Sequence, residues 1–472
     1  MIKNKLNRMM EKERDEQEFV AVNFIAAVRG KLEALELQQK YDALEDKLKT
    51  EFGRTFEPIP HVDDLPNDVY CRIKLRDATK TISKRTYGCP RKYREAWKIL
   101  IDKHVESGKI RLSNSEFASP SFIIPKTDPT ALPRWVNDYR ELNSNVIIDS
   151  HPLPRVDDIL ADCAKGKIWA VIDMTDSFFQ TRVHPDDIHL TAVTTPFGLY
   201  EWTVMPMGYR NAPSIQQRRV IAALRKYLGK ICHIYLDDII VCSQDIVEHE
   251  KNVQLILQAL IDAKLYCNKK KSRLFSFRVN FLGHMISQDG IEADEKKAEK
   301  IENWPVPTNA TETRAFLGLM RYLNVFLPKL AVQSDILLVF ITKETEKKFP
   351  EWRPKHQLAF DTIKAIVTSW ECLTSINHEN MGQNKIFVTT DASDRVSGAV
   401  LSFGPTWESA RPVAYNSMTF KGPELNYPVY EKELLAIMRA LRKWKVDLLG
   451  SEFFVYTDHK TLLNFDRQKD MS

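Results

Sequence analysis

Two adjacent aspartates between two apolar, β-prone runs are the feature that most constrains what this chain can fold into. The stretch in question is Ile234-Tyr235-Leu236-Asp237-Asp238-Ile239-Ile240. A core strand normally excludes carboxylates, because an unpaired buried charge is very costly. A tight hairpin tolerates the pair, since both carboxylates then lie at the turn with the apolar runs on either side. Hard cations such as Mg²⁺ would neutralise the two charges there.

A second apolar strand ends in a further acid. Residues 170–172 read Ala-Val-Ile and are followed by Asp173, which precedes Asp237 by 64 residues. If the two strands are neighbours in one sheet, Asp173 and Asp237 lie side by side. Convergent carboxylates of this kind hold two Mg²⁺ ions about 3.5 to 4 Å apart, the arrangement used for in-line phosphoryl transfer. An aspartate pair alone is common in surface turns, so the prediction depends on its apolar setting.

Length and composition set the class of protein. A chain of 472 residues is expected to hold two to four domains, and 43% apolar with 28% charged residues is typical of a soluble globular protein. No apolar run approaches the roughly 18 residues of a membrane span, and the charged first residues lack the apolar stretch of a secretory signal. The seven cysteines include no CxxC pair, which favours reduced thiols over a zinc site or disulfides. The sequence therefore predicts an intracellular, cytoplasmic protein without a membrane partner.

Basic residues gather in two stretches, although the net charge is only +5. Residues 76–98 hold eight basic and two acidic residues, and residues 264–278 hold six basic residues and no acidic one. Such patches can bind phosphate backbones. Taken singly, each stretch is more simply a solvated charged face.

Helical and strand patterns alternate along the chain. The first 50 residues read as helix, with Leu37, Tyr41, Leu44 and Leu48 on one face, and three prolines between 56 and 68 indicate an extended connector. Further on, the patterns favour a mixed sheet with helices packed on it. The expected helices span 91–107, 215–228 and 248–263, and the expected strands span 122–124, 168–172, 231–235 and 239–242.

The motifs along the chain resemble those of reverse transcriptases, in the order of that family. Tyr235-Leu236-Asp237-Asp238 resembles the YxDD box, and Phe316-Leu317-Gly318-Leu319 resembles a thumb helix of gypsy-type LTR retrotransposons. Asn137, Met207 and Asn268-Lys269 depart from the usual pattern, but no metal ligand is lost. The other matching segments are 135–143, Asp173 with 177–180, 196–200, 205–208, 211–213, Lys270-Lys271 and 281–284.

This resemblance implies roles for individual residues. Asp173 and Asp237 would be the main metal ligands, with Asp238 supporting them. Phe178 would exclude the ribose 2′-hydroxyl, unless it is an ordinary core aromatic. The remaining positions implied are Lys126 and Arg134 for the incoming triphosphate, Lys271 (or Lys270) for protonating pyrophosphate, and a primer-steering hairpin at Phe281, Leu282 and Gly283. Lys126 and Arg134 can also be solvated surface cations, and burial alone can explain Phe281 and Leu282.

A second acidic cluster follows near the C-terminus. Asp391 ends a predicted strand, Glu433 lies in a predicted helix and Asp458 ends another strand. The order resembles ribonuclease H, which implies that the three acids hold two Mg²⁺ ions that position a water against an RNA strand. Glu431 is the alternative to Glu433. His459, Asp466 and Asp470 are expected to be solvated or loop residues, and the fourth acid of that family is missing, so the domain is expected to be truncated.

The resemblance therefore implies an α+β fold: a right-hand polymerase of fingers, palm and thumb, followed by a truncated α/β ribonuclease H-like domain. The expected parts are a helical extension (1–52), fingers and palm (53–286), thumb and connector (287–380) and partial ribonuclease H (381–472). The implied activity is DNA synthesis on an RNA or DNA template with a primer, from deoxynucleoside triphosphates. Mg²⁺ is the expected cofactor, with Mn²⁺ as an alternative, and a homodimer inside virus-like particles is the expected setting. The rival hypotheses are a decayed or domesticated element that binds nucleic acid without catalysis and a replicase that makes RNA.

Overall fold

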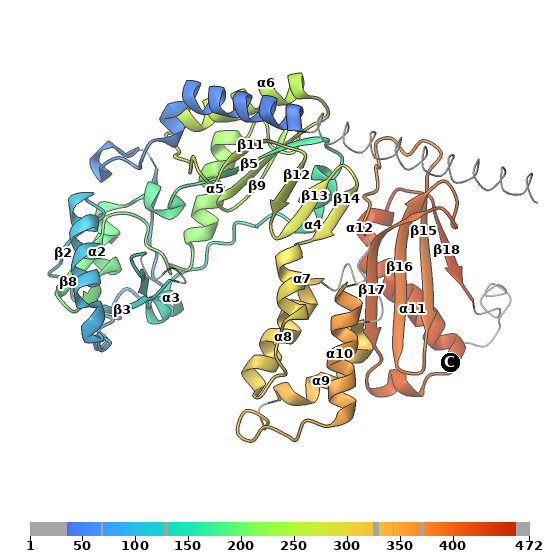
Figure 1. Ribbon diagram of the computed structural model, residues 1–472. Coiled ribbons are helices and arrows are strands. Elements are labelled where there is room, and N and C mark those ends of the chain that lie inside the picture. Colours follow the sequence, from blue (N-terminus) through green and yellow to red (C-terminus); the bar gives the residue numbers. More distant parts are fainter. Residues whose placement is uncertain are drawn as a thin grey trace, which may run out of the picture. The chain divides into compact units, whose positions relative to one another are not determined.

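A computed structural model describes residues 35–67, 69–126, 128, 131–323, 330–342, 344–368 and 372–458. The chain divides into two compact units, whose elements are shown in Figure 1. The first unit comprises residues 1–153, 169–241 and 246–276. The second comprises residues 154–168, 242–245 and 277–472.

A four-stranded sheet organises the first unit, with the strand order β11-β5-β10-β9. Its strands are β5 (Ile168–Asp173), β9 (Cys232–Tyr235), β10 (Asp238–Ser243) and β11 (Arg273–Ser276). Helices α5 (Ala212–Leu224) and α6 (Ile246–Asp262) accompany it, and α6 buries Val253, Ile256 and Leu260 along one face. The sheet thus interleaves strands that are far apart in the sequence.

A helix at residues 35–51, called the N-terminal helix below, lies beside α6 (Figure 1). Of its predicted apolar face, Tyr41 and Leu48 are buried, whereas Leu37 is 38% exposed. The ring of Tyr41 packs 5.8 Å from that of Phe275 on β11. The C-terminal two-thirds of the helix therefore packs against the rest of the first unit.

A five-stranded sheet, ordered β2-β8-β7-β3-β4, forms the other part of the first unit. Trp97, Trp135 and Trp202 meet in its core at edge-to-face ring distances of 4.7 and 5.2 Å. The elements here are β2 (Ile110–Leu112), β3 (Ser119–Ile124), β4 (Arg134–Asn137), β7 (Val193–Thr195), β8 (Gly198–Trp202), α2 (Arg94–Glu106) and α3 (Arg140–Asn145), together with the parallel pair β1 (Tyr70–Cys71) and β6 (Arg182–Val183).

The second unit begins with a small antiparallel sheet and a group of helices. Gly290 opens β14 with φ of 135°, and a Cβ there would lie 2.1 Å from the carbonyl oxygen of Leu373, so only glycine fits. Phe316 and Phe360 pack 4.7 Å apart between α8 and α10. The elements are α4 (Val156–Cys163), β12 (Arg278–Phe281), β13 (His284–Ser287), β14 (Gly290–Ala293), α7 (Glu295–Glu302), α8 (Ala310–Leu323), α9 (Leu330–Leu337) and α10 (Pro354–Thr368).

The C-terminal part of this unit is a sheet ordered β17-β16-β15-β18. Its elements are β15 (Lys385–Ala392), β16 (Val396–Gly404), β17 (Arg411–Thr419), α11 (Val429–Lys443), α12 (Lys445–Leu448) and β18 (Phe453–Thr457). Because β18 pairs parallel to β15, the chain needs the crossover through α11 that lies between β17 and β18. Ile386, Val388 and Leu401 bury one face of the sheet against Ala440 and Trp444.

The expected α+β architecture is confirmed. Each expected strand and helix beyond residue 90 has a counterpart within a few residues of its predicted bounds. Within the described part of the chain, no helix is both long and apolar enough to span a membrane.

Candidate active sites

The predicted acidic hairpin is present between β9 and β10. Tyr235 pairs with Asp238, which leaves Leu236 and Asp237 in the turn. Leu236 adopts φ of 56°, a conformation that is costly for a branched residue and recurs at functional sites. Gln217 on α5 holds the turn, since its amide donates to the Ile234 carbonyl (3.2 Å) and its oxygen accepts from the Leu236 amide (2.6 Å).

Asp173 lies at the end of β5, and β5 is hydrogen-bonded to β10. The amide next to it, that of Met174, donates to the carbonyl of Asp237 over 3.1 Å. The hydroxyl of Ser177 donates to Oδ1 of Asp237 over 2.5 Å. The structure thus makes Asp173 a neighbour of Asp237 and Asp238, although the oxygens of these three residues do not all lie within 4.8 Å of one another.

The electrostatics of the three acids indicate a site suited to a cation. Burial, followed by the charges of Asp173 and Asp237, raises the pKa of Asp238 to about 6, and the charge of Lys271 opposes this rise only in part. Burial also raises the pKa of Asp237, with Asp173 adding to the effect and the Ser177 hydrogen bond opposing it. Clustered carboxylates without full compensation are what a divalent cation binds.

Lys271 is the lysine that the structure places beside the aspartates. Its Nζ lies 3.5 Å from Oδ1 of Asp173, a loose ion pair. Two hydrogen bonds from backbone amides to the Asn268 side chain, from Lys270 and Lys271 at 3.1 Å each, shape the loop that carries it. Of the two alternatives weighed from the sequence, Lys271 is therefore favoured over Lys270.

Phe178 and Phe179 have different surroundings. Phe179 is buried and stacks on Trp202 with ring centroids 5.2 Å apart. Phe178 is only partly buried against the same core. Its incomplete burial leaves part of the ring accessible, and a role in excluding the ribose 2′-hydroxyl stays a prediction.

Arg134 lies on the five-stranded sheet and Lys126 lies just beyond one of its strands, whereas the aspartates lie on the four-stranded sheet. Arg134 pairs with Ile124 across β3 and β4, and Lys126 follows two residues later. Both side chains are exposed. Their role with a triphosphate stays a prediction.

The expected hairpin at Phe281–Gly283 is formed in the second unit. Phe281 pairs with His284, and both Leu282 (φ 51°) and Gly283 (φ 79°) take left-handed conformations in the turn. Phe281 is 1% exposed, so packing accounts for it. Leu282 and Gly283 are the residues that the turn presents, and their contact with a primer stays a prediction.

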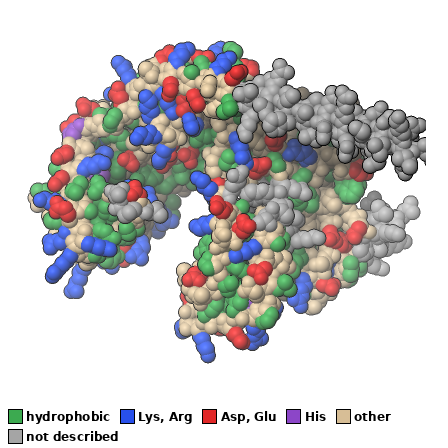
Figure 2. Space-filling view, viewed as in Figure 1, with side chains coloured by type: hydrophobic (Ala, Val, Ile, Leu, Met, Phe, Trp, Pro, Cys, Tyr) green, Lys and Arg blue, Asp and Glu red, His purple; other side chains and the backbone are tan. Residues whose placement is uncertain are grey.

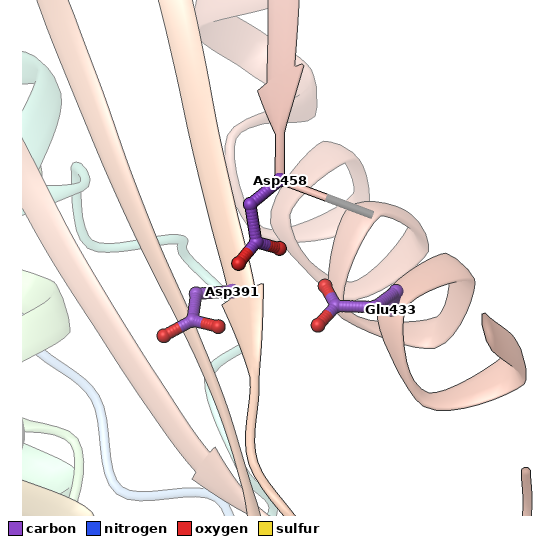
Figure 3. Close-up of side chains that lie close together, drawn as sticks. All are labelled: Asp391, Glu433 and Asp458. Atoms are coloured by element: carbon purple, nitrogen blue, oxygen red, sulfur yellow. The ribbon is translucent and has the colours of Figure 1, made fainter. Parts of the chain in front are cut away.

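The acids of the second cluster converge, as Figure 3 shows for Asp391, Glu433 and Asp458. They come from β15, α11 and the residue after β18, and one oxygen of each lies within 4.8 Å of the others. Among the described residues this is the only such group of three. Glu433 is buried and accepts a hydrogen bond from the Ala392 amide over 3.0 Å. Glu431 is outside the group, while His459, Asp466 and Asp470 lie outside the described residues.

The two basic stretches are partly paired with acids. Lys84 lies 3.3 Å from Glu141, and Arg278 lies 2.7 Å from Glu292. Figure 2 shows Lys and Arg side chains interspersed with Asp and Glu over the visible face. A contact with nucleic acid stays a prediction for both stretches.

Several buried polar side chains support the first site without having been predicted from the sequence. Gln180 is fully buried, donates to the carbonyls of Thr175 and Tyr266 and accepts from the Tyr266 amide. Arg219 donates to the Gln180 carbonyl over 2.6 Å. One sequence feature could have indicated such buried polar residues. It is the polar run Gln216-Gln217 with Arg219, at positions where α5 faces the core.

Comparison with known proteins gives two family matches. Residues 124–286 match the family described as reverse transcriptase (RNA-dependent DNA polymerase). Residues 382–472 match the family described as RNase H-like domain found in reverse transcriptase.

Two curated relatives come from Drosophila melanogaster. The retrovirus-related Pol polyprotein from transposon 297 is 36% identical over 365 residues, covering 77% of this chain and 33% of that protein. The one from transposon gypsy is 35% identical over 375 residues, covering 77% of this chain and 36% of that protein. The chain therefore spans about a third of the length of these relatives.

A solved structure shares the fold. A foamy viral protease-reverse transcriptase in complex with dsDNA matches with a TM-score of 0.77 at 23% identity, covering 89% of this chain and 86% of that chain. At this identity the likeness concerns the fold alone. Together with the family matches, it confirms the expected polymerase fold followed by a ribonuclease H-like domain.

Proposed function

The chain carries the reverse transcriptase and ribonuclease H-like domains of a gypsy-type retrotransposon Pol polyprotein, and from this premise we propose that it is an RNA- and DNA-templated DNA polymerase. The observation that carries the proposal is the meeting of Asp173, at the end of β5, with Asp237 and Asp238 at the β9–β10 turn. The substrates would be deoxynucleoside triphosphates and a primer on an RNA or DNA template. The dsDNA in the foamy viral structure is consistent with such a partner.

Asp173 and Asp237 would hold two divalent cations, Mg²⁺ or Mn²⁺, with Asp238 in support. Bound there, the cations would activate the primer 3′-hydroxyl and neutralise the leaving pyrophosphate. The raised pKa of Asp238, about 6, supports the fit, because it reflects clustered negative charge that a cation would relieve.

Other side chains would act on the substrates directly. Lys271, 3.5 Å from Asp173, would hold a proton for the leaving pyrophosphate. Phe178 would block a ribose 2′-hydroxyl with the part of its ring that is not buried. Lys126 and Arg134 would bind the triphosphate, and Leu282 and Gly283 would steer the primer end.

In the second unit, Asp391, Glu433 and Asp458 would hold cations that position a water against the RNA strand of a hybrid. The proposed boundaries are an N-terminal extension to residue 52, fingers and palm to 286, thumb and connector to 380, and ribonuclease H from 381. The family matches that end at 286 and begin at 382 support the boundaries at 286 and 380, and the boundary at 52 stays a prediction. Incompleteness of the ribonuclease H domain, a homodimer and packaging in virus-like particles stay predictions.

The test is extension of oligo-dT on poly-rA with Mg²⁺, with dTTP and UTP compared as substrates. We expect extension with dTTP that EDTA abolishes. Tight binding of the template–primer without extension in Mg²⁺ or Mn²⁺ would instead favour a domesticated binding protein. Preference for UTP would favour an RNA replicase.

A further inference from the structure

A buried ion pair on the N-terminal helix lies against the loop that carries Lys271. Glu45 and Lys49 are 5% and 6% exposed, and their oxygen and nitrogen are 2.7 Å apart. Both residues are more than 200 positions from the loop in the sequence. The resemblance to reverse transcriptases gives this helix no role.

The pair holds the loop at three points. The Lys49 ammonium donates to the carbonyls of Lys269 (2.9 Å) and Ser272 (2.6 Å) and to the carboxylate of Glu45. These three bonds use all three hydrogens of the ammonium. The other oxygen of Glu45 accepts from the Leu274 amide over 2.8 Å. The two bonded carbonyls bracket Lys270 and Lys271, so they set the path of the backbone through Lys271.

The same loop is bonded to the catalytic strand. The amide of Asp173 donates to the Ser272 hydroxyl over 3.1 Å, and the amide of Asn268 donates to the Asp173 carbonyl over 2.8 Å. Further along the chain, Thr55 makes two hydrogen bonds. Its hydroxyl donates to the Leu265 carbonyl, and the backbone carbonyl of Thr55 accepts from the Cys267 amide. Residues 45–55 thus bond to the loop and to the segment directly before it, while Asp173 bonds to the loop at Asn268 and Ser272.

A buried ion pair is weak evidence for stability, since well-packed apolar residues often serve as well. Directional bonds to a loop do something that apolar packing cannot, which is to fix where the loop backbone lies. We propose that Glu45 and Lys49 are positioning residues, which keep Lys271 beside Asp173 during nucleotide addition. This inference rests on the proposed polymerase function.

The decisive variant is Lys49→Met, which keeps an unbranched side chain of nearly the same length and removes the ammonium that makes the hydrogen bonds. Lys47→Met is the matched control, because Lys47 lies on the same helix but pairs at the surface with Glu250 over 3.2 Å. We expect Lys49→Met to lower the single-turnover rate about tenfold or more at unchanged template–primer affinity, as misplaced catalytic groups do. Lys47→Met should retain the wild-type rate, and Lys49→Arg, which keeps the donors, should recover part of the loss.

A double variant separates positioning from general stability. If Lys49 acts through Lys271, Lys49→Met should have little further effect in a Lys271→Met background. Equal loss of rate in both backgrounds would overturn the inference, and so would a wild-type rate for Lys49→Met.

Amide hydrogen exchange tests the same contacts without any activity. The Leu274 amide should exchange faster in Lys49→Met than in Lys47→Met. Equal exchange would overturn the inference. If the wild type extends no primer, the proposed function fails, while the exchange result still decides whether the pair holds the loop.

Discussion

The hydrogen bond from Ser177 to Asp237 joins the segment after β5 to the turn between β9 and β10. Ser177 is buried and opens a short 3-10 helix, Ser177–Gln180, directly after Asp176, whose φ is 38°. Aspartate tolerates this left-handed conformation better than most residues. The left-handed residue is followed by the turn that brings the Ser177 hydroxyl to Asp237, so residues that follow Asp173 contact the other proposed metal ligand.

We expect Asp237→Asn to abolish primer extension, by at least about a hundredfold, because the amide keeps the shape but loses the charge that a cation requires. Affinity for the template–primer should stay near the wild-type value. Asp262→Asn, an exposed position at the end of α6, is the control. Near wild-type extension by Asp237→Asn would show that the site is misassigned.

Phe178→Val is expected to raise incorporation of ribonucleotides relative to deoxynucleotides, because a smaller side chain leaves room for the 2′-hydroxyl. The measurement is the ratio of kcat/KM for dTTP and UTP. Phe178→Tyr keeps a ring at this position and should keep the wild-type ratio. An unchanged ratio in Phe178→Val would return the residue to a packing role.

Single substitutions can show whether Glu433 or Glu431 is the metal ligand of the second acidic cluster. Glu433→Gln should weaken Mn²⁺ binding to the second unit and abolish cleavage of RNA in a labelled RNA–DNA hybrid, since Glu433 lies with Asp391 and Asp458. Glu431→Gln should leave both properties as they are. Primer extension serves as the control for both variants, because the polymerase aspartates belong to the first unit. The reverse outcome would exchange the two roles.

Replacing Lys84 and Arg85 by alanine should flatten the dependence of template–primer binding on salt. Each phosphate contact on a duplex contributes about −0.9 to the slope of log K against log salt. Because Lys84 already pairs with Glu141 at 3.3 Å, its share is expected to be smaller than that of a free cation. The alanine pair at Lys40 and Lys47 on the N-terminal helix is the control, and equal slopes in the two double variants would leave residues 84 and 85 as a solvated face.

The lowered pKa of His104 should make the free energy of unfolding depend on pH. Burial among Trp135, Phe179 and Trp202, with Lys109 and Lys103 nearby, lowers its pKa from 6.5 to about 4. Between these values the unfolded chain binds a proton that the folded chain does not, so stability falls as the pH falls. The loss attributable to this group is roughly 2 to 3 kcal/mol at pH 4. Urea denaturation should show a weaker loss of stability from pH 7.5 to 5 in His104→Leu, and an equally steep loss would refute the assignment.

The sequence was informative where a local pattern carried the chemistry. Apolar runs interrupted by acids predicted the hairpin at Asp237 and the strand that ends in Asp173, because hydrophobicity and strand ends are local properties. The choice of Glu433 over Glu431 likewise depended on its place directly before an apolar run.

What could not be predicted depends on partners brought together by the tertiary structure. Ser177 reaches Asp237 across 60 residues, and Lys49 reaches Ser272 across 223. Each is an ordinary polar residue in its own segment. Two departures from the family pattern also prove to be neighbours, since the Asn137 side chain donates to the Met207 carbonyl over 3.2 Å.

The strand order β11-β5-β10-β9 also has a consequence for how the protein is made. During synthesis from the N-terminus, β5 emerges first, but its two neighbours lie about 65 and 100 residues further along the chain. Asp173 therefore cannot be fixed in place by local contacts, and closing these long loops is a slow step in folding. A nascent chain that ends between Asp238 and Arg273 would hold all three of the aspartates and still lack the complete four-stranded sheet. The polymerase site would then form after translation of this segment, as one late and cooperative event.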